Sequence, residues 1–312
     1  MTTYSTAPAL IHTGYHKTGT TWLQHHVFDN PEAGFYRLPL DDIMKHIVDV
    51  NALDFKAETC RETLAPHSQR AADAGLQLVV SQERLSGSPH TGGYDSKELA
   101  DRLVKVFPNA RVLIVIREQR SMCSSAYRQY LRGGGSYSLD EYLRPRRRKK
   151  PGFDPAHLQY HRLVRYYMEL FGETNVCVLP YEMFRAAPMD FLATLLQFAG
   201  VPAEIERFRD VVGLKSNASR THLRNIVKRR LNPFLLKDHD SLGRVLHIPG
   251  LRVIATPLLW LVDRLAPSAL EVRLERKSYD TICACTCGCY AESNRITSRL
   301  TGLDLAGYGY ET

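Results

Sequence analysis

The sequence has no run of apolar residues long enough to cross a membrane. A spanning helix needs about 18 or more consecutive apolar residues, and the longest apolar stretch here, residues 257–262, stops at Asp263. Residues 1–5 also lack the basic segment and the apolar stretch of a secretory signal. These absences argue against an integral membrane protein, and we expect a cytoplasmic one.

Cysteine is scarce, and its pattern does not favour a metal site or a disulfide framework. Of the seven cysteines, Cys60, Cys123 and Cys177 are scattered, and we expect them to be reduced and buried. The other four alternate with other residues over 283–289. This run lacks the C-x-x-C pairs of structural zinc and has no histidine nearby. A soft-metal site stays an alternative, but small residues in a C-terminal helix are the favoured interpretation.

Acidic residues are outnumbered, with 33 Asp and Glu against 41 Lys and Arg and a net charge of +8. Such an excess indicates an anionic ligand or surface without choosing among them. Much of it lies in residues 144–150 and 220–237. Two interpretations stay open for both segments, a solvated surface or a peripheral contact with an anionic membrane. We expect no nucleic acid partner.

The apolar residues form short β-branched runs separated by amphipathic segments. The runs are continuous rather than alternating, as in parallel strands covered on both faces. Strands that alternate with helices predict right-handed crossovers, and hence an α/β fold with a doubly wound central parallel sheet flanked by helices. The expected strands are residues 9–13, 76–81, 111–116 and 175–179, and the main expected helices are residues 20–28, 97–107, 120–132, 161–171 and 188–199.

We interpret the 312 residues as a single domain with three parts. Residues 8–219 form the α/β core, and residues 276–312 form a helical tail. Residues 220–275 differ in being basic and interrupted by prolines. For this additional helical region a lid, a dimer surface and a membrane-lying helix stay open, and an extra helical layer on the core is favoured.

Residues 14–22 read GYHKTGTTW and join the first expected strand to the first expected helix. Two glycines bracket the turn, so the backbone can bend sharply and bring its N–H groups close to an anion. A lysine adds a positive charge, and three threonines add hydroxyl donors. The segment therefore predicts a phosphate cradle, made by Gly14, Lys17, Thr18, Gly19, Thr20 and Thr21.

The position of the lysine decides which kind of cradle this is. A nucleoside-triphosphate P-loop has lysine directly after its second glycine, whereas Lys17 stands two residues before Gly19. A P-loop nucleotide kinase using ATP is therefore the less favoured alternative. The string from His16 to Trp22 instead resembles the 5′-phosphosulfate loop of sulfotransferases, which have a P-loop-like α/β fold and use 3′-phosphoadenosine 5′-phosphosulfate (PAPS).

A second group of residues follows the expected strand 111–116. Arg117 ends this strand, at the edge where α/β sheets bind ligands, and a guanidinium suits the bidentate binding of phosphate. With Ser125 eight residues later and Tyr127 beyond, Arg117 resembles the family's 3′-phosphate motif. Tyr181 and Asn217 resemble further family positions, after a late strand and in an Asn-x-Ser loop near the nucleotide.

The resemblance implies an enzyme that transfers a sulfuryl group from PAPS to a hydroxyl or amine, with no metal required. A carbohydrate or glycolipid acceptor is favoured, and a small molecule stays open. Lys17 would be catalytic. Glu83, after the strand 76–81, is our candidate for the general base, with His16 in reserve. The alternative for Glu83 is a surface carboxylate or a salt-bridged one, with Arg84 as the partner. The implied cofactor-binding residues are His16, Lys17, Thr18, Gly19, Thr20, Thr21, Trp22, Arg117, Ser125, Tyr181 and Asn217.

Overall fold

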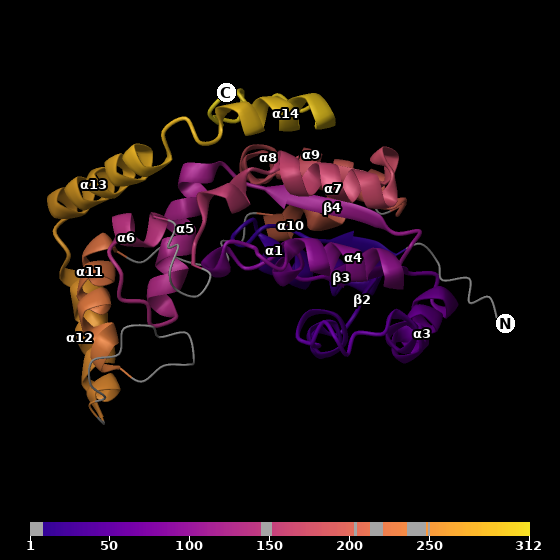
Figure 1. Ribbon diagram of the computed structural model, residues 1–312, viewed down its shortest axis with the longest axis horizontal. Helices are drawn as coiled ribbons and strands as arrows, with labels where there is room; N and C mark the ends of the chain where they lie inside the picture. Colours follow the sequence, from indigo (N-terminus) through magenta and orange to yellow (C-terminus); the bar gives the residue numbers. More distant parts are fainter. Residues whose placement is uncertain (1–8, 145–151, 203–204, 213–220, 236–247, 249) are drawn as a thin grey trace.

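A computed structural model describes residues 9–144, 152–202, 205–212, 221–235, 248 and 250–312. A sheet of five parallel strands lies at its centre, in the order β2-β3-β1-β4-β5 (Figure 1). The strands are β1 (Leu10–His12), β2 (Phe35–Arg37), β3 (Gln77–Ser81), β4 (Arg111–Ile116) and β5 (Val176–Pro180).

Helices cover both faces of this sheet, which confirms the predicted doubly wound α/β fold. Ile11, Val112 and Ile114 pack on one face with α3, α4 and α7, while Leu113 and Val115 pack on the other with α1 and α9. Burial of each such side chain contributes about 1.5–3 kcal/mol. The core helices are α1 (Thr20–Leu23), α2 (Leu40–Ile43), α3 (Ala57–Asp73), α4 (Ser96–Val106), α5 (Gln119–Arg132), α6 (Leu139–Leu143), α7 (His161–Phe171), α8 (Tyr181–Ala186), α9 (Pro188–Ala199) and α10 (Arg209–Val212).

The structure differs from the sequence prediction mainly at three places in the first part of the chain. Helix α3 was not among the predicted helices. Strand β2 was not predicted either, because Phe35-Tyr36-Arg37 is not a continuous run of β-branched apolar residues. Helix α1 is also shorter than predicted. It ends at Leu23, and Gln24–Phe28 continues as a turn of π-helix.

The order of the strands places two loops side by side. The chain leaves β1 toward β2 and β3, and later adds β4 and β5 on the other side of β1. Loops at such a switch point share the carboxyl edge where α/β sheets bind ligands. Hydrogen bonds extend the pairing past β1, from Thr13 N to Leu113 O (3.0 Å) and from Tyr15 N to Val115 O (3.0 Å). The loop of residues 14–19 therefore lies next to the end of β4.

Three helices form a separate layer at one end of the molecule, which we call the arm (Figure 1). They are α11 (His222–Leu231), α12 (Leu251–Leu265) and α13 (Ser268–Thr286). The Asp263 carboxylate in α12 accepts hydrogen bonds from the Thr221 hydroxyl (2.8 Å) and Arg224 Nη1 (2.8 Å). Through these bonds α12 holds the start of α11, and α13 in turn packs on α5 and α6.

No helix in the described part of the chain has by itself the length and apolar character to cross a bilayer. Helices α12 and α13 reach that standard only as a pair, and they are bent by 102° where they meet. The cysteine run is helical only in part, because α13 ends at Thr286 and Gly288 turns the chain with φ of 68°. All four of these cysteines are free, and within the described ranges no group of three or more potential metal ligands is close enough to hold an ion.

The last helix, α14 (Ala291–Thr301), packs on α7 and contacts the start of α5, and the residues after it reach α8. Asn294 Oδ1 accepts a hydrogen bond from Gln119 Nε2 (2.6 Å), and its own amide donates to the Glu311 carbonyl (2.8 Å). The Tyr310 hydroxyl donates to Glu182 Oε2 (2.8 Å). The tail therefore supports the segment that carries Arg117.

Candidate active site at the carboxyl edge of the sheet

The loop between β1 and α1 is built around its glycines and one lysine in an unusual conformation. Gly19 and Lys17 have φ of 85° and 67°, and Lys17 is the one non-glycine residue with positive φ in the described ranges. Gly14 has no space for a side chain, because a Cβ atom there would lie 2.8 Å from His12 Nε2 and 3.0 Å from Thr18 Oγ1. The Thr18 hydroxyl donates to the Tyr15 carbonyl (2.5 Å) and closes the turn.

The start of α1 offers hydrogen-bond donors that the folded chain does not use. The first N–H groups of a helix have no partner within it, and no side chain caps this one. Thr21 is exposed at its surface, while Thr20 is buried and its hydroxyl has no partner among the described residues. Because a helix N-terminus also carries a partial positive charge, the site suits a phosphate or sulfate group.

His16 lies inside this loop, 7% exposed, with neither ring nitrogen hydrogen-bonded to a described residue. Burial lowers its pKa to about 3, assisted by the nearby charges of His90, Arg84, His157 and Lys17. The imidazole is therefore neutral at physiological pH. It can donate or accept one hydrogen bond to a ligand at each nitrogen, according to its tautomer.

Positive charge converges on the Lys17 side chain. Partial burial lowers the pKa of Lys17, and the neighbouring Arg132, Arg117 and Arg128 lower it further. Glu83 acts in the opposite direction and raises the pKa. Mutual repulsion among these cations is relieved when an anion binds between them, so the arrangement favours a multiply charged ligand.

Arg117 connects the segment after β4 to the loop of residues 14–19 by a hydrogen bond. Its Nη1 donates to the Lys17 carbonyl (2.9 Å), and its Nε and Nη2 donate to Ser121 Oγ (3.0 and 2.6 Å). The guanidinium carbon also lies 4.9 Å from the centre of the Tyr181 ring. These contacts leave one N–H on each Nη atom available for a ligand. The structure thus brings Arg117, Lys17 and Tyr181 together as the sequence predicted.

Ser121, which contacts Arg117 directly, was not among the site residues predicted from the sequence. It stands four residues after Arg117, one turn before Ser125 on the same side of α5. Ser125 is nearly buried and makes no hydrogen bond within the described chain. Tyr127 turns elsewhere, since its hydroxyl donates to the Tyr137 carbonyl (2.9 Å). The four-residue spacing between Arg117 and Ser121 was the available signal.

Three further candidates have distinct surroundings. Tyr181 covers the loop, and its ring would lie 3.4 Å from a Cβ atom placed on Gly19. Trp22 is 4% exposed and packs in the core, with ring centroids 4.8 Å from Phe184 and 5.1 Å from His26. Asn217 lies outside the described residues.

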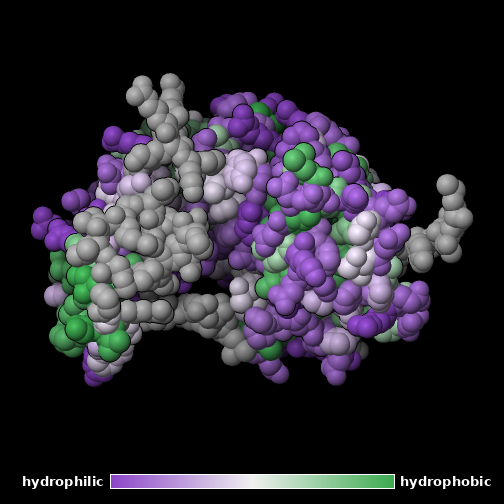
Figure 2. Space-filling model, turned by 60° about the horizontal axis from the view of Figure 1, so that its bottom comes forward, coloured by the Kyte–Doolittle hydropathy of each residue, from purple (hydrophilic) through white to green (hydrophobic). Residues whose placement is uncertain are grey.

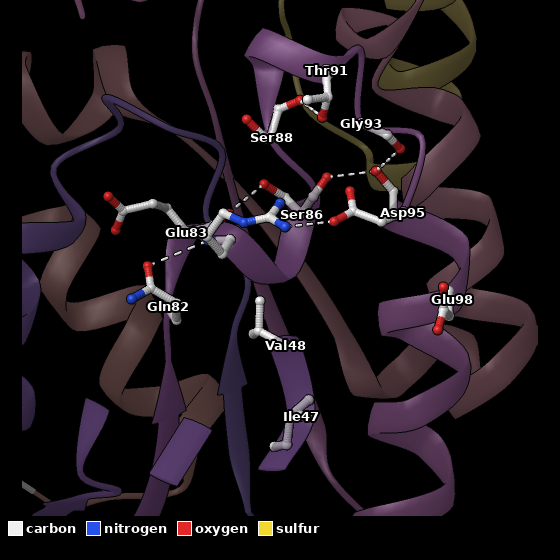
Figure 3. A network of polar contacts seen from close by, with 12 residues as sticks. Ile47, Val48, Gln82, Glu83, Ser86, Ser88, Thr91, Gly93, Asp95 and Glu98 are labelled. Atoms are coloured by element: carbon white, nitrogen blue, oxygen red, sulfur yellow. Dashed lines mark hydrogen bonds and ion pairs between the residues drawn. The ribbon is translucent and has the colours of Figure 1, made fainter. Parts of the chain in front are cut away.

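Glu83 follows β3 at the same edge of the sheet, and its carboxylate makes no hydrogen bond or ion pair with a described residue. The alternative of a salt bridge with Arg84 is wrong, because Arg84 Nη2 binds Asp95 Oδ2 (2.6 Å) instead. Figure 3 shows the Glu83 carboxylate pointing away from Asp95. An unpaired carboxylate near Lys17 is therefore left to act on a ligand.

Comparison with known proteins agrees with this geometry. The model of the sulfotransferase family matches residues 8–205. No curated protein sequence is significantly similar to the chain. A solved sulfotransferase from Alicyclobacillus acidocaldarius has 20% identity and a TM-score of 0.46, over 75% of this chain and 98% of its own. A mouse sulfotransferase complexed with PAP has 12% identity and a TM-score of 0.41, over 86% and 88%. The match over residues 8–205 shows that this chain belongs to the sulfotransferase family.

Proposed function

We propose that this sulfotransferase takes the sulfuryl group from PAPS and transfers it to a hydroxyl or amine of a glycan or glycolipid. One observation carries the proposal: an anion cradle with unused donors and converging cations faces the unpaired carboxylate of Glu83 at one edge of the sheet. PAPS would supply an activated sulfuryl group on a phosphate leaving group. The protein would then position the reactants and balance charge, as in phosphoryl transfer.

On the donor side, the first loop would hold the 5′-phosphosulfate. The backbone N–H groups of Thr18 to Thr21 and the hydroxyls of Thr20 and Thr21 would be its hydrogen-bond donors, with His16 beside them. The Thr18 hydroxyl would act by closing the turn, since its proton is donated to the Tyr15 carbonyl. Lys17 would counter the negative charge that grows on the leaving group. Trp22, being buried, would act by anchoring α1 under Gly19 rather than by touching the nucleotide.

The 3′-phosphate would be bound by Arg117 through the N–H groups that Lys17 and Ser121 leave free. Ser125 would add a hydroxyl one turn further along α5, and Tyr181 would close the site over Gly19. We propose Asn217 as a further nucleotide contact. Selection of PAPS over ATP would follow, because ATP has no phosphate at the 3′ position.

On the acceptor side, Glu83 is the residue best placed to take a proton. A general base must lie within reach of the proton that it takes and be free to accept it. The Glu83 carboxylate is free, since Arg84 is held by Asp95. His16 is buried inside the donor loop among cations, so it is better placed to contact the donor than to take the acceptor's proton.

Titration calorimetry with adenosine 3′,5′-bisphosphate, ADP and ATP tests the donor assignment. We expect the bisphosphate to bind more tightly than ADP, and Lys17→Ala to weaken its binding by at least about tenfold, as for a lost charge-assisted hydrogen bond. Lys105→Ala is the matched control, since Lys105 is an exposed lysine on α4. Preference for ATP with magnesium would replace this proposal with the kinase alternative.

The acceptor would be presented at a membrane surface on the cytoplasmic side. Helix α12 carries apolar side chains that the fold leaves exposed, including Val253 (76%), Ile254 (66%) and Leu265 (66%). Figure 2 shows this hydrophobic surface gathered on the arm, at the left. Trp260 is 55% exposed, with the Arg264 guanidinium 5.5 Å from its ring, a combination suited to a headgroup region.

Positive charge accompanies this apolar face. Helix α11 contributes Lys228, Arg229 and Arg230 beside α12, in the basic segment 220–237. The other basic segment, 144–150, lies outside the described residues apart from Arg144. Basic residues next to exposed apolar ones are the composition that binds anionic bilayers.

Sedimentation with phospholipid vesicles tests the membrane contact. We expect binding to vesicles containing phosphatidylserine and little binding to neutral vesicles. The triple variant Val253→Ser, Ile254→Ser, Leu261→Ser should lose it, whereas Leu53→Ser with Tyr94→Ser, which alters exposed apolar residues outside the arm, should not. Equal binding by both variants would contradict the proposal, and concentration-dependent dimerisation lost only in the triple variant would assign the face to a second copy.

A further inference from the structure

A cavity of about 290 Å³ lies where the arm meets the core. Helices α5 and α6 form one side of it, and α11 and α13 form the other. This volume is at the lower limit of ligand pockets, so it suits one sugar ring or one headgroup rather than a long chain. Cationic side chains come from both sides, namely Arg128 from α5, Arg229 from α11 and Lys277 from α13.

Arg128 is the lining residue whose charge an anionic ligand would stabilise most. Burial lowers its pKa, and the like charges of Arg117 and Arg132 lower it further, with Glu275 opposing them. Its guanidinium makes no hydrogen bond and no ion pair with any described residue. Because a partly buried charge without a partner is costly, the position is stabilised when an anion enters.

The rest of the lining is consistent with an anion site. Ser124, Asn225 and Ser278 supply neutral polar groups, and the lining has one carboxylate, that of Asp140. The Asp140 carboxylate is itself engaged, since Oδ1 accepts a hydrogen bond from the Ser138 hydroxyl (2.7 Å). Three cations against one occupied carboxylate leave an excess of positive charge in the cavity.

The cavity is connected to the transfer site through α5. This helix begins next to Arg117 and carries Ser121, Ser125 and Arg128 at successive turns. Arg128 and Arg132 are both near enough to Lys17 to lower its pKa. An acceptor held by Arg128 therefore lies close to the site of sulfuryl transfer.

Half of the lining lies outside the part of the chain that matches the family model. The match ends at residue 205, whereas Arg229 and Lys277 belong to the arm. A pocket needed to hold the common donor is expected within the family core. This location favours a role in choosing the acceptor.

We propose that this cavity binds an anionic group of the acceptor, a carboxylate or a phosphate, so that the enzyme sulfates a molecule that is already negatively charged. The inference rests on the proposed function and names the class of its acceptor. Arg128 and Arg229 would bind the anion from opposite walls, with Ser124 and Asn225 as further hydrogen-bonding groups. The hydroxyl or amine to be sulfated would then point toward Glu83.

The test measures binding, with protein saturated by adenosine 3′,5′-bisphosphate so that the nucleotide subsites are filled. Saturation-transfer NMR compares glucuronate, glucose 6-phosphate and uncharged glucose as probes. We expect one or both anionic sugars to bind and glucose not to bind. The preference between the two anionic sugars distinguishes a uronic acid acceptor from a phosphate-bearing one.

Two matched pairs of substitutions test which residues bind the anionic probe. Arg229→Gln with Lys277→Gln alters the lining and should weaken the anionic probe by about tenfold or more, while bisphosphate affinity stays unchanged. Arg230→Gln with Arg276→Gln removes two exposed charges from the same helices outside the lining and should change neither. Unfolding curves establish that both proteins are folded.

Three results would overturn the proposal. They are equal binding of glucose and the anionic sugars, unchanged binding in the lining variant, and loss of bisphosphate affinity in that variant, which would assign the cavity to the nucleotide. Failure of the proposed function would look different. The bisphosphate would then not bind at all, whereas the anionic sugars would still bind to the free protein and respond to the lining variant.

Discussion

The core and the arm use their apolar and charged residues in opposite ways. In the core, sheet residues such as Ile114 and Val115 are fully buried, and the loops at the sheet edge are held by short hydrogen bonds. In the arm, most of the large side chains of α12 face solvent, and cations such as Arg229 have no partner among the described residues. The core buries its apolar residues and gathers its unpaired groups, such as the Glu83 carboxylate and the His16 ring nitrogens, at one edge of the sheet, whereas the arm also leaves large apolar side chains exposed.

This difference suggests a division of labour. The part that matches the sulfotransferase family carries the anion cradle, Arg117 and Glu83, which would perform a reaction common to many enzymes. The arm lies outside that match and would decide which molecule is sulfated and where. The two tryptophans of the chain report on the two regions separately, because Trp22 is buried in the core and Trp260 lies on the arm.

The largest expected effect is the loss of core stability in acid, because the buried neutral histidines His12 and His16 belong to the core. Burial lowers the pKa of each to about 3. Below pH 6.5 the unfolded chain binds protons at both residues and the folded chain does not. Their contribution to stability is therefore complete above pH 6.5 and is lost progressively between pH 6.5 and about 3. The slope should approach about 2.7 kcal/mol per pH unit for the two residues.

Urea unfolding at several pH values, followed by Trp22 in a Trp260→Phe variant, measures this slope for the core. His16→Gln should reduce this slope by about half, because one of the two proton-binding histidines is removed. His25→Gln, which alters an exposed histidine, serves as the control. An unchanged slope in His16→Gln would show that other groups dominate the acid sensitivity.

Glu83→Gln should have the next largest effect, which is on the rate of sulfuryl transfer. It distinguishes a residue that takes part in the reaction from one that stabilises the core. Loss of a general base lowers kcat by about 10²–10⁴-fold. The stability of the fold should change little, because the Glu83 carboxylate makes no hydrogen bond or ion pair with a described residue. Binding of adenosine 3′,5′-bisphosphate should not weaken, because the substitution removes a negative charge near Lys17. The matched change Asp95→Asn should instead lower stability by about 1–3 kcal/mol through Arg84. Full activity in Glu83→Gln would direct attention to another base.

Arg117→Lys should weaken nucleotide binding by about 10- to 100-fold. Lysine keeps the charge but cannot contact the Lys17 carbonyl, Ser121 and the Tyr181 ring together. Calorimetry with the bisphosphate measures the loss. Arg111→Lys, at the opposite end of the same strand, is the control, and equal losses in the two variants would argue against a specific role for Arg117.

Asp263→Asn should produce the smallest change and one confined to the arm. The substitution weakens the hydrogen bonds from Thr221 and Arg224 that join α11 to α12, at a cost of about 1–3 kcal/mol. Fluorescence of Trp260 in a Trp22→Phe variant should report earlier unfolding of the arm, with bisphosphate binding unchanged. Loss of nucleotide binding would show that the arm also supports the core.

The sequence predicted the parts of the molecule that local patterns determine. Four of the five strands, five of the ten core helices and the strand–loop–helix of residues 14–22 follow from continuous apolar runs and from glycine spacing, whereas the long helix α3 was not predicted. The three-residue β2 and the π-helical turn after Leu23 do not, because pairing with β3 and packing in the core decide them.

The partners of charged side chains were harder to predict than their positions. Arg84 stands next to Glu83 in the sequence but binds Asp95, which the following loop brings into reach. Arg117 similarly binds Ser121 rather than Ser125, because α5 begins directly after it. Such choices depend on the directions of side chains in space. The cavity between α5 and the arm is beyond sequence reasoning for the same reason, since it joins residues about 150 positions apart.

The backbone of Lys17 has a consequence for how the loop could evolve. A residue with a side chain at φ of 67° is strained by about 1 kcal/mol or more relative to glycine. Glycine at this position would therefore relax the loop and raise the melting temperature, but it would remove the charge that the cradle needs. Natural or engineered variants selected for heat resistance alone would be expected to drift toward an inactive protein at this one residue.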